Sequence, residues 1–211
     1  MNRLTLLVLA VLLFVAGCGE PDKPSIPLNL AIERGDINQI ERHLLWGSDI
    51  NKFNINGEAP LHVAVRQGSY IVVKLLVEKG ADINLLDKQG VSPLGRAILS
   101  GRTQIADYLI KKGAKQDPDG LLDLMVKSGE QDRDIIPLLI KWGARINHQN
   151  EQGQTPLILA VSSGNRILVK HLIENGADVN LANNAGQRPL AIARERGDEN
   201  IIRMLERNGA Q

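Results

Sequence analysis

The chain has almost no cysteine, few aromatic residues and no surplus of either charge. Its 211 residues include one cysteine, Cys18, so an internal disulfide cannot form and the folded domain is held together by packing alone. Aromatic residues make up only 3% of the composition. Neither charge is in surplus, because 25 Lys and Arg face 24 Asp and Glu, and no basic cluster stands out. This balance argues against nucleic acid as a partner and against electrostatic binding to membranes.

Residue patterns typical of enzymes are also missing. The cysteine and the histidines share no metal-ligand spacing, and no Gly-x-Ser-x-Gly motif marks a nucleophilic serine. The histidines are widely separated, as His43, His62, His148 and His171. We therefore predict that the chain is not an enzyme and that it holds no metal and no cofactor.

The N-terminal segment combines a basic start with one apolar run. Arg3 precedes residues 4–17, which as a helix would span roughly 21 Å, too short for a comfortable crossing of a bilayer core. A charged start, a short apolar middle and small residues at the exit are typical of a secretory signal peptide. We therefore predict that residues 1–17 are a signal peptide.

The end of this segment, Val15-Ala16-Gly17-Cys18, resembles the lipobox of bacterial lipoproteins. The resemblance implies cleavage before Cys18 and acylation of its thiol and new amino group, leaving residues 18–25 as an acylated cysteine and a short linker. Several acyl chains on one residue satisfy the requirement for stable anchoring. Gly19 stands where an Asp would favour the inner membrane in enterobacterial lipoproteins, so we expect an outer-membrane anchor facing the periplasm. The alternative is an ordinary cleavable signal with a buried cysteine.

The rest of the chain consists of internal repeats. One proline-containing motif occurs five times, as IPLNLA (26–31), APLHVA (59–64), SPLGRA (92–97), TPLILA (155–160) and RPLAIA (188–193). A second motif, such as GADIN at 80–84, begins at glycines that are spaced by 33, 33, 30, 33 and 33 residues from Gly47 to Gly209. Self-similarity at such a period is the signature of a repeat architecture.

Each repeat has the signals of two short helices. A proline such as Pro60 fits the first helical position, where no N–H is needed, and Ser92 and Thr155 can cap the free amides. A glycine such as Gly68 ends this helix, and a second helix with apolar spacing follows. Because one such unit cannot bury its apolar face alone, stability comes from stacking neighbours.

These motifs closely resemble the ankyrin repeat. The resemblance covers about residues 26–211 and implies an all-α solenoid of about six helix-turn-helix repeats with short finger loops. It also implies that His62, in the family's Thr-Pro-Leu-His position, bonds to neighbouring backbone. Arg194 stands where inner repeats carry Val65 and Ile98, as expected of a solvent-facing end cap.

The fourth repeat departs from the pattern. Between Gly113 and Leu122 the chain is five residues shorter than its counterparts, and we expect the proline at the helix start to be lost. Between Gly129 and Gly143 it is two residues longer. We therefore expect a stunted finger and an enlarged loop between the helices. Two interpretations are open: a tolerated, drifted repeat, or a notch shaped for one partner.

Ankyrin arrays contact their partners through finger tips and the exposed ends of the first helices. Transferred repeat by repeat, these positions are Glu33, Arg34, Ile55, Asn56, Glu58, Arg66, Gln67, Lys88, Gln89, Val91, Leu99, Ser100, Lys127, Ser128, Glu151, Gln152, Gln154, Ser162, Ser163, Asn184, Gln187, Glu195 and Arg196. The set is mixed in charge and mostly polar. That is consistent with a folded protein partner, and equally with a solvated surface.

Two tryptophans directly precede the glycine that ends a second helix, where other repeats carry residues such as Lys79 and Lys112. Trp46 and Trp142 therefore occupy a position that is polar in most repeats, and tryptophan is enriched in interface hot spots. We include both as contact candidates. The alternative is that each lies flat over its own repeat and covers a gap.

A lipid-anchored periplasmic binding module of this plan resembles immunity proteins that protect bacteria from their own type VI secretion effectors, particularly phospholipases. The resemblance implies that a concave surface covers the active-site mouth of the toxin. The linker from Gly19 to Ser25 reaches at most roughly 25 Å, which holds the module close to the membrane. The alternative is an envelope adaptor or stress-protection protein with a housekeeping partner.

Overall fold

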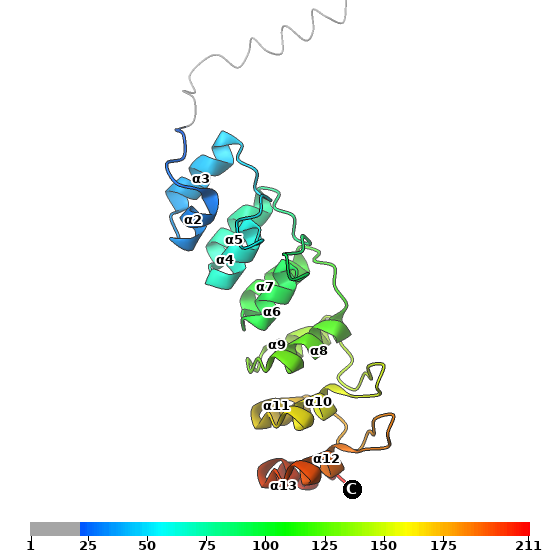
Figure 1. Cartoon of the computed structure of the whole chain (residues 1–211). Coiled ribbons are helices and arrows are strands. Elements are labelled where there is room, and N and C mark those ends of the chain that lie inside the picture. The colour runs from blue at the N-terminus through cyan, green and yellow to red at the C-terminus, as the bar shows by residue number, and fades with distance from the viewer. Residues whose placement is uncertain (1–21) are drawn as a thin grey trace, which may run out of the picture.

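A computed structural model describes residues 22–211, so the predicted signal peptide, the anchor at Cys18 and the first linker residues lie outside the described residues. The described part contains twelve helices and no β-strand, arranged as six pairs in one elongated row (Figure 1). The first helices of the pairs are α2 (Leu28–Glu33), α4 (Pro60–Gln67), α6 (Pro93–Leu99), α8 (Pro118–Ser128), α10 (Pro156–Ser163) and α12 (Pro189–Arg196). The second helices are α3 (Ile37–Trp46), α5 (Tyr70–Glu78), α7 (Thr103–Lys111), α9 (Ile135–Lys141), α11 (Arg166–Glu174) and α13 (Glu199–Arg207). The predicted all-α solenoid of six repeats is confirmed.

Helix ends follow the local signals in the sequence. Ser92 Oγ accepts a hydrogen bond from the N–H of Gly95 at 3.0 Å, and Thr155 Oγ1 accepts one from Ile158 at 3.2 Å. Gly68 ends α4 with a φ of +72°, which a residue with a side chain rarely adopts. Within residues 22–211, no helix combines the length and the apolar character that a membrane span needs.

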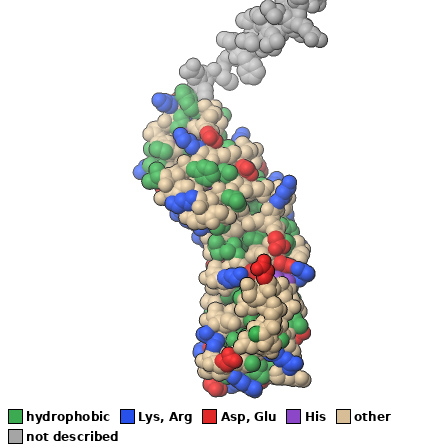
Figure 2. Space-filling view, turned by 45° about the vertical axis from the view of Figure 1, so that its right-hand side comes forward, with side chains coloured by type: hydrophobic (Ala, Val, Ile, Leu, Met, Phe, Trp, Pro, Cys, Tyr) green, Lys and Arg blue, Asp and Glu red, His purple; other side chains and the backbone are tan. Residues whose placement is uncertain are grey.

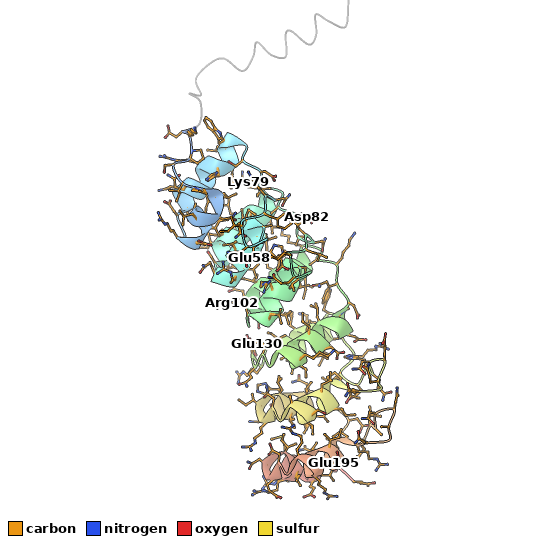
Figure 3. The ribbon with its side chains drawn as sticks, in the orientation of Figure 1. Glu58, Lys79, Asp82, Arg102, Glu130 and Glu195 are labelled. Atoms are coloured by element: carbon orange, nitrogen blue, oxygen red, sulfur yellow. The ribbon has the colours of Figure 1, made fainter. Side chains whose placement is uncertain are left out.

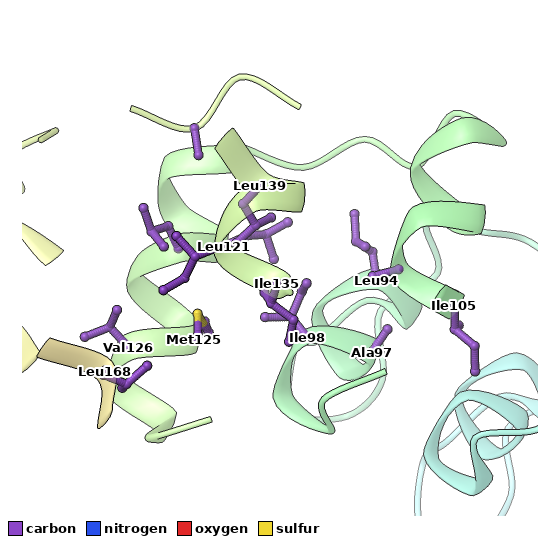
Figure 4. Packing of buried hydrophobic residues seen from close by; sticks show 14 of the residues in the cluster. Leu94, Ala97, Ile98, Ile105, Leu121, Met125, Val126, Ile135, Leu139 and Leu168 are labelled. Atoms are coloured by element: carbon purple, nitrogen blue, oxygen red, sulfur yellow. The ribbon is translucent and has the colours of Figure 1, made fainter. Parts of the chain in front are cut away.

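One aliphatic core runs through the whole row. Ile98, Leu122 and Leu139 are fully buried and belong to three different helices, and Figure 4 shows how such side chains fill the space between α6, α8 and α9. Each first helix packs on the first helix of the next repeat, whereas the second helices touch their neighbours less. The stack therefore curves, with the first helices on the inner, concave side and the second helices on the outer side.

The last repeat ends the stack with charge instead of apolar surface. Arg194 is exposed, and its Nη2 lies 2.9 Å from Glu206 Oε1, whereas Val65 and Ile98 at the same position of inner repeats are fully buried. The charge at this position therefore faces solvent in the last described repeat, as predicted.

Repeat four confirms the expected loops but not the expected helix start. Only residues 114–117 lie between Gly113 and α8, so the finger is missing, and the loop of residues 129–134 before α9 is enlarged. The predicted loss of the proline is wrong, because Pro118 occupies the first turn of α8 with Asp117 as its cap. The shorter connection before α8 has no room for a finger but still contains a proline and a capping residue. Relative to the repeat motif, α8 therefore begins about one turn earlier, and it has 11 residues against 8 in α4.

Candidate protein-binding surface

The finger loops are rigid turns built around one side chain. In the third repeat, Asp87 N donates to the carbonyl of Val91 at 2.9 Å, and Asp87 Oδ1 accepts from the N–H groups of Gln89 at 2.9 Å and Val91 at 3.0 Å. The other full fingers repeat this arrangement around Asn54, Asn150 and Asn183. The tips of all four fingers are therefore held in place without a partner.

Neighbouring fingers are joined in two pairs. Lys88 N donates to Gly57 O at 3.1 Å in the N-terminal pair, and Asn184 N donates to Gln152 O at 3.1 Å in the C-terminal pair. The second contact is close because Gly153 has no side chain: a Cβ there would lie 2.7 Å from the backbone nitrogen of Asn184. The missing finger of repeat four leaves a gap between the pairs.

A hydrogen-bond ladder at the base of the fingers bridges this gap. In regular repeats an asparagine accepts from the backbone of the next repeat, as Asn51 Oδ1 does from Asp82 N at 2.9 Å. In repeat four, Asp117 caps α8 instead, and Asp119 Oδ1 accepts from Arg145 N at 2.7 Å. Burial alone would raise the pKa of Asp119, but the N–H and guanidinium of Arg145 outweigh it and lower the pKa. The hydrogen-bond ladder therefore continues across the gap left by the missing finger of repeat four.

The concave side of repeats one to three holds a polar groove of about 670 Å³. Its walls are charged or amide side chains from two fingers and three inner helices: Glu33, Asn56, Glu58, Arg66, Gln67, Lys88, Gln89 and Arg96. Arg66 lies between two acids, with Nε 3.2 Å from Glu58 Oε1 and Nη2 3.7 Å from Glu33 Oε1. These pairs fix the guanidinium in the groove.

A second arginine is held at the floor of this groove. Arg96 of α6 pairs with the fully buried carboxylate of Asp87 and donates from Nη2 to Gln89 Oε1 at 3.2 Å. Burial would raise the pKa of Asp87, but the N–H groups of Val91 and Gln89 and the Arg96 guanidinium lower it below its usual value. His62 Nε2 lies 3.1 Å from the carbonyl of Val91, as the family resemblance implied, and burial lowers its pKa. This cluster ties finger, helix and neighbouring repeat together.

At the notch, a histidine joins repeats four and five. His148 is buried, with Nδ1 2.9 Å from the carbonyl oxygen of Arg145 and Nε2 2.9 Å from Asp123 Oδ1. Lys127 Nζ lies 3.9 Å from the other oxygen of Asp123. These contacts stabilise the point where the finger is missing, so repeat four is an integrated part of the stack.

The concave side of repeats five and six carries amides in place of ion pairs. Asn150 Nδ2 donates to Gln154 Oε1 at 3.2 Å, and Asn183 Nδ2 donates to Gln187 Oε1 at 3.2 Å. Arg196 Nη1 donates to the carbonyl of Ser162 at 2.6 Å. The two ends of the concave surface thus share the same backbone structure, but one carries ion pairs and the other carries amide hydrogen bonds.

Comparison with known proteins agrees with this geometry. The family model described as ankyrin repeats (3 copies) matches residues 28–119 and again residues 122–211. The chain belongs to the ankyrin-repeat family. Ankyrin repeats bind other proteins, so the array is a protein-binding module, and no enzyme family is matched. Comparison with curated protein sequences gives no match.

Solved ankyrin structures resemble most of the chain. The human ASB11 ankyrin repeat domain is 28% identical with a TM-score of 0.72, over 88% of this chain and 85% of that one. The ankyrin repeat domain of Bcl-3, a member of the IκB protein family, is 27% identical with a TM-score of 0.72, over 90% and 89%. A chain from the complex of a predatory endopeptidase of Bdellovibrio bacteriovorus with an immunity protein is 26% identical with a TM-score of 0.70, over 88% of this chain and 99% of that one.

Most predicted contact residues of the ankyrin array face solvent. The exposed ones are Glu33, Arg34, Ile55, Asn56, Arg66, Gln67, Lys88, Gln89, Lys127, Ser128, Glu151, Gln152, Ser163, Asn184, Glu195 and Arg196. Half-buried are Val91, Leu99, Ser100, Gln154, Ser162 and Gln187. Glu58, labelled in Figure 3, differs because it is only 8% exposed. Both its carboxylate oxygens accept hydrogen bonds from Arg66. Glu58 is therefore a positioning residue for Arg66 and is too buried to contact a partner itself.

The two tryptophans differ in environment, and both lie at the C-terminal ends of outer helices, away from the groove. Trp46, at the end of α3, is 45% exposed, whereas Trp142, after α9, is half-buried against the core. The reading in which a tryptophan covers its own repeat therefore fits Trp142 better than Trp46.

Sequence reasoning missed the ion pair at the floor of the groove. Arg96 occupies a position where other repeats have apolar residues such as Val63 and Ile192, and Asp87 stands where the other fingers have asparagine. The sequence did contain a signal for this ion pair: in one repeat, an acidic and a basic residue together replace the neutral residues found at both positions in the other repeats. Among residues 22–211, no group of three or more potential ligands is placed to hold a metal ion.

Proposed function

We propose that this array is an immunity protein that binds and blocks a secreted antibacterial effector from a lipid anchor at Cys18 in the bacterial envelope. The observation that carries the proposal is the groove between the first three repeats. Its arginines are held by Glu58 and Asp87, so little side-chain freedom is lost when a partner binds. A rigid, polar, concave face of this kind suits the convex rim of a folded enzyme.

The likeness to a chain of an endopeptidase–immunity protein complex supports this proposal. It extends over nearly the whole of that chain and most of this one, so it includes both halves of the array. The effector of that complex is an endopeptidase, whereas the present sequence led us to expect a phospholipase. Both an endopeptidase and a phospholipase are hydrolases, and identification of the captured partner would distinguish the two classes.

The test is an affinity capture of the full-length protein from membranes of its own species, with partners identified by mass spectrometry. We expect one dominant secreted hydrolase, whose activity falls when the array is added. The variants Arg66→Glu and Lys127→Glu place negative charge at the groove and beside the notch, and should weaken capture without unfolding the array.

Lys170→Glu is the matched control, because Lys170 is an exposed lysine on the outer helix α11, away from the concave side. It should leave capture unchanged. Full capture and inhibition by the Arg66 and Lys127 variants would exclude this surface. Recovery of resident envelope proteins alone, indifferent to both variants, would overturn the immunity role and leave the envelope adaptor.

A further inference from the structure

Large apolar side chains that face solvent are concentrated near the N-terminal end of the array. Among residues 22–211, six of the seven such side chains lie between residues 45 and 86, and the seventh is Ile167. Figure 2 shows broad hydrophobic areas on the repeats that adjoin the grey N-terminal residues. Three of the six are on outer helices: Leu45 and Ile71 are each 70% exposed and Trp46 is 45% exposed. Apolar groups gathered in this way mark an interaction site.

A groove of about 260 Å³ lies between α3 and α5, and Leu45 is part of its lining. The groove is lined by Glu41, Leu44, Leu45, Leu75 and Lys79. Ile71 lies one helical turn before Leu75, and Trp46 follows Leu45 directly. We call this set the outer-helix patch (Leu45, Trp46, Ile71 and Leu75).

The chain enters the array along the same helix. Ser25 N donates to Gln39 Oε1 at 2.9 Å, and the Asp22 carboxylate lies 3.4 Å from Arg42 Nη2. Gln39 and Arg42 are one turn apart on α3, so the linker, followed backwards from Ser25, runs toward the C-terminal end of that helix. Trp46 lies one turn beyond Arg42 on the same face.

The tether to a lipid anchor is therefore shorter than the linker length suggests. Four peptide links separate Cys18 from Asp22, and they span at most about 14 Å. A folded domain does not fit into such a gap, since a domain of 100 residues has a radius of gyration of about 13 Å and is therefore at least about 26 Å wide. Acyl chains attached to Cys18 would hold α3 against the lipid surface itself.

We infer that the outer-helix patch inserts into the headgroup region of the membrane that holds the acyl chains, an inference that rests on the proposed lipidation of Cys18. Tryptophan is enriched at that depth, and the ammonium of Lys79 at the edge of the groove can reach the phosphates while its stem stays among apolar groups. The patch is on the outer side of the stack. The polar groove on the inner side consequently faces away from the bilayer and stays open to a partner.

The test uses the two tryptophans of the full-length lipoprotein as separate reporters. Trp142→Phe leaves Trp46 as the only tryptophan, and Trp46→Phe leaves Trp142, three repeats away, as a matched control. Each variant is reconstituted into vesicles of phosphatidylethanolamine and phosphatidylglycerol with brominated acyl chains, and flotation confirms attachment. We expect Trp46 to lose more than half of its emission relative to unbrominated vesicles and Trp142 to keep its emission.

A second variant separates insertion from mere proximity. Leu45→Gln combined with Ile71→Gln, in the Trp142→Phe background, keeps the tether but removes two exposed apolar groups, so the protein should float and Trp46 should regain most of its emission. Unchanged quenching in this variant, or no quenching of Trp46 in floated protein, would overturn the inference while leaving the anchor and partner binding intact. Failure to float would overturn the anchor and the inference together, and partner capture tests the binding role separately.

Discussion

The two finger pairs of the array share a backbone and differ in chemistry. In repeats two and three the fingers carry Glu58 and Asp87, which hold arginines from the inner helices. In repeats five and six, Asn150 and Asn183 bond to glutamines in the same finger. Backbone hydrogen bonds set the shape of the finger in both pairs. The remaining side chains are therefore free to differ in charge, which lets one fold present two surfaces.

The largest expected effect breaks the connection between the two halves. Leu122→Ala removes a fully buried side chain from α8 and should cost about 2–5 kcal/mol of stability. Because each repeat contacts only its neighbours, a cavity in repeat four should separate unfolding into two transitions. Circular dichroism against urea measures this, with Leu205→Ala in the last repeat as the control, which should fray one end only. A single shifted transition for Leu122→Ala would contradict it.

A smaller effect distinguishes two glycines of the C-terminal finger pair. Both have positive φ, at +69° for Gly153 and +76° for Gly186, but only Gly153 touches the next finger. Strain should cost about 1 kcal/mol in Gly186→Ala, and the clash with Asn184 should bring Gly153→Ala to about 3 kcal/mol. Thermal unfolding compares the two. Equal losses would show that the fingers are not in contact.

The charged finger can be converted to the chemistry of the other three. Asp87→Asn keeps the oxygen that accepts from Gln89 and Val91 and removes the negative charge beside Arg96, with a loss of about 1–3 kcal/mol at neutral pH. The folded pKa of Asp87 is lowered, so this stability is fully present above its usual pKa of 3.8 and is lost as the pH falls through the folded pKa. The difference in stability between the two proteins should therefore be largest at pH 7 and become smaller as the pH is lowered below 3.8. A difference that does not change with pH would assign the loss to packing.

The smallest effect should be equal in both halves. Glu78 pairs with Lys74 on α5 and Glu174 pairs with Lys170 on α11, all at exposed positions of outer helices. Glu78→Gln and Glu174→Gln should each change stability by less than about 0.5 kcal/mol. Chemical denaturation of both variants provides the measurement, and an unequal result would reveal a role of one outer helix that the ion pairs do not explain.

Regular repeats were predictable because their signals are local. Pro60 at a helix start and Gly68 at its end act within one turn of backbone, so the sequence motif is enough to place α4. Repeat four was predicted only in part. Its missing finger follows from the count of residues, but the new role of Pro118 depended on where the helix could restart.

The sequence predicted which positions of the candidate site face solvent, but it did not predict which side chains contact one another. Most of the transferred contact positions are exposed, yet nothing in the motif indicated that Glu58 turns inward to Arg66. Nor did it reveal Asp119 as the substitute in the inter-repeat ladder, because that contact joins residues 26 positions apart.

The sequence by itself determined the solenoid: helix caps, glycine turns and apolar spacing act over a few residues, and their period specifies stacking. Only the tertiary structure decided which charges meet in the groove, how Asp119 links repeats four and five, and that residues 22–25 lie along α3. The physical reason is distance along the chain. Contacts between repeats depend on curvature and side-chain reach across the stack, and a repeat motif, which describes one unit at a time, contains neither.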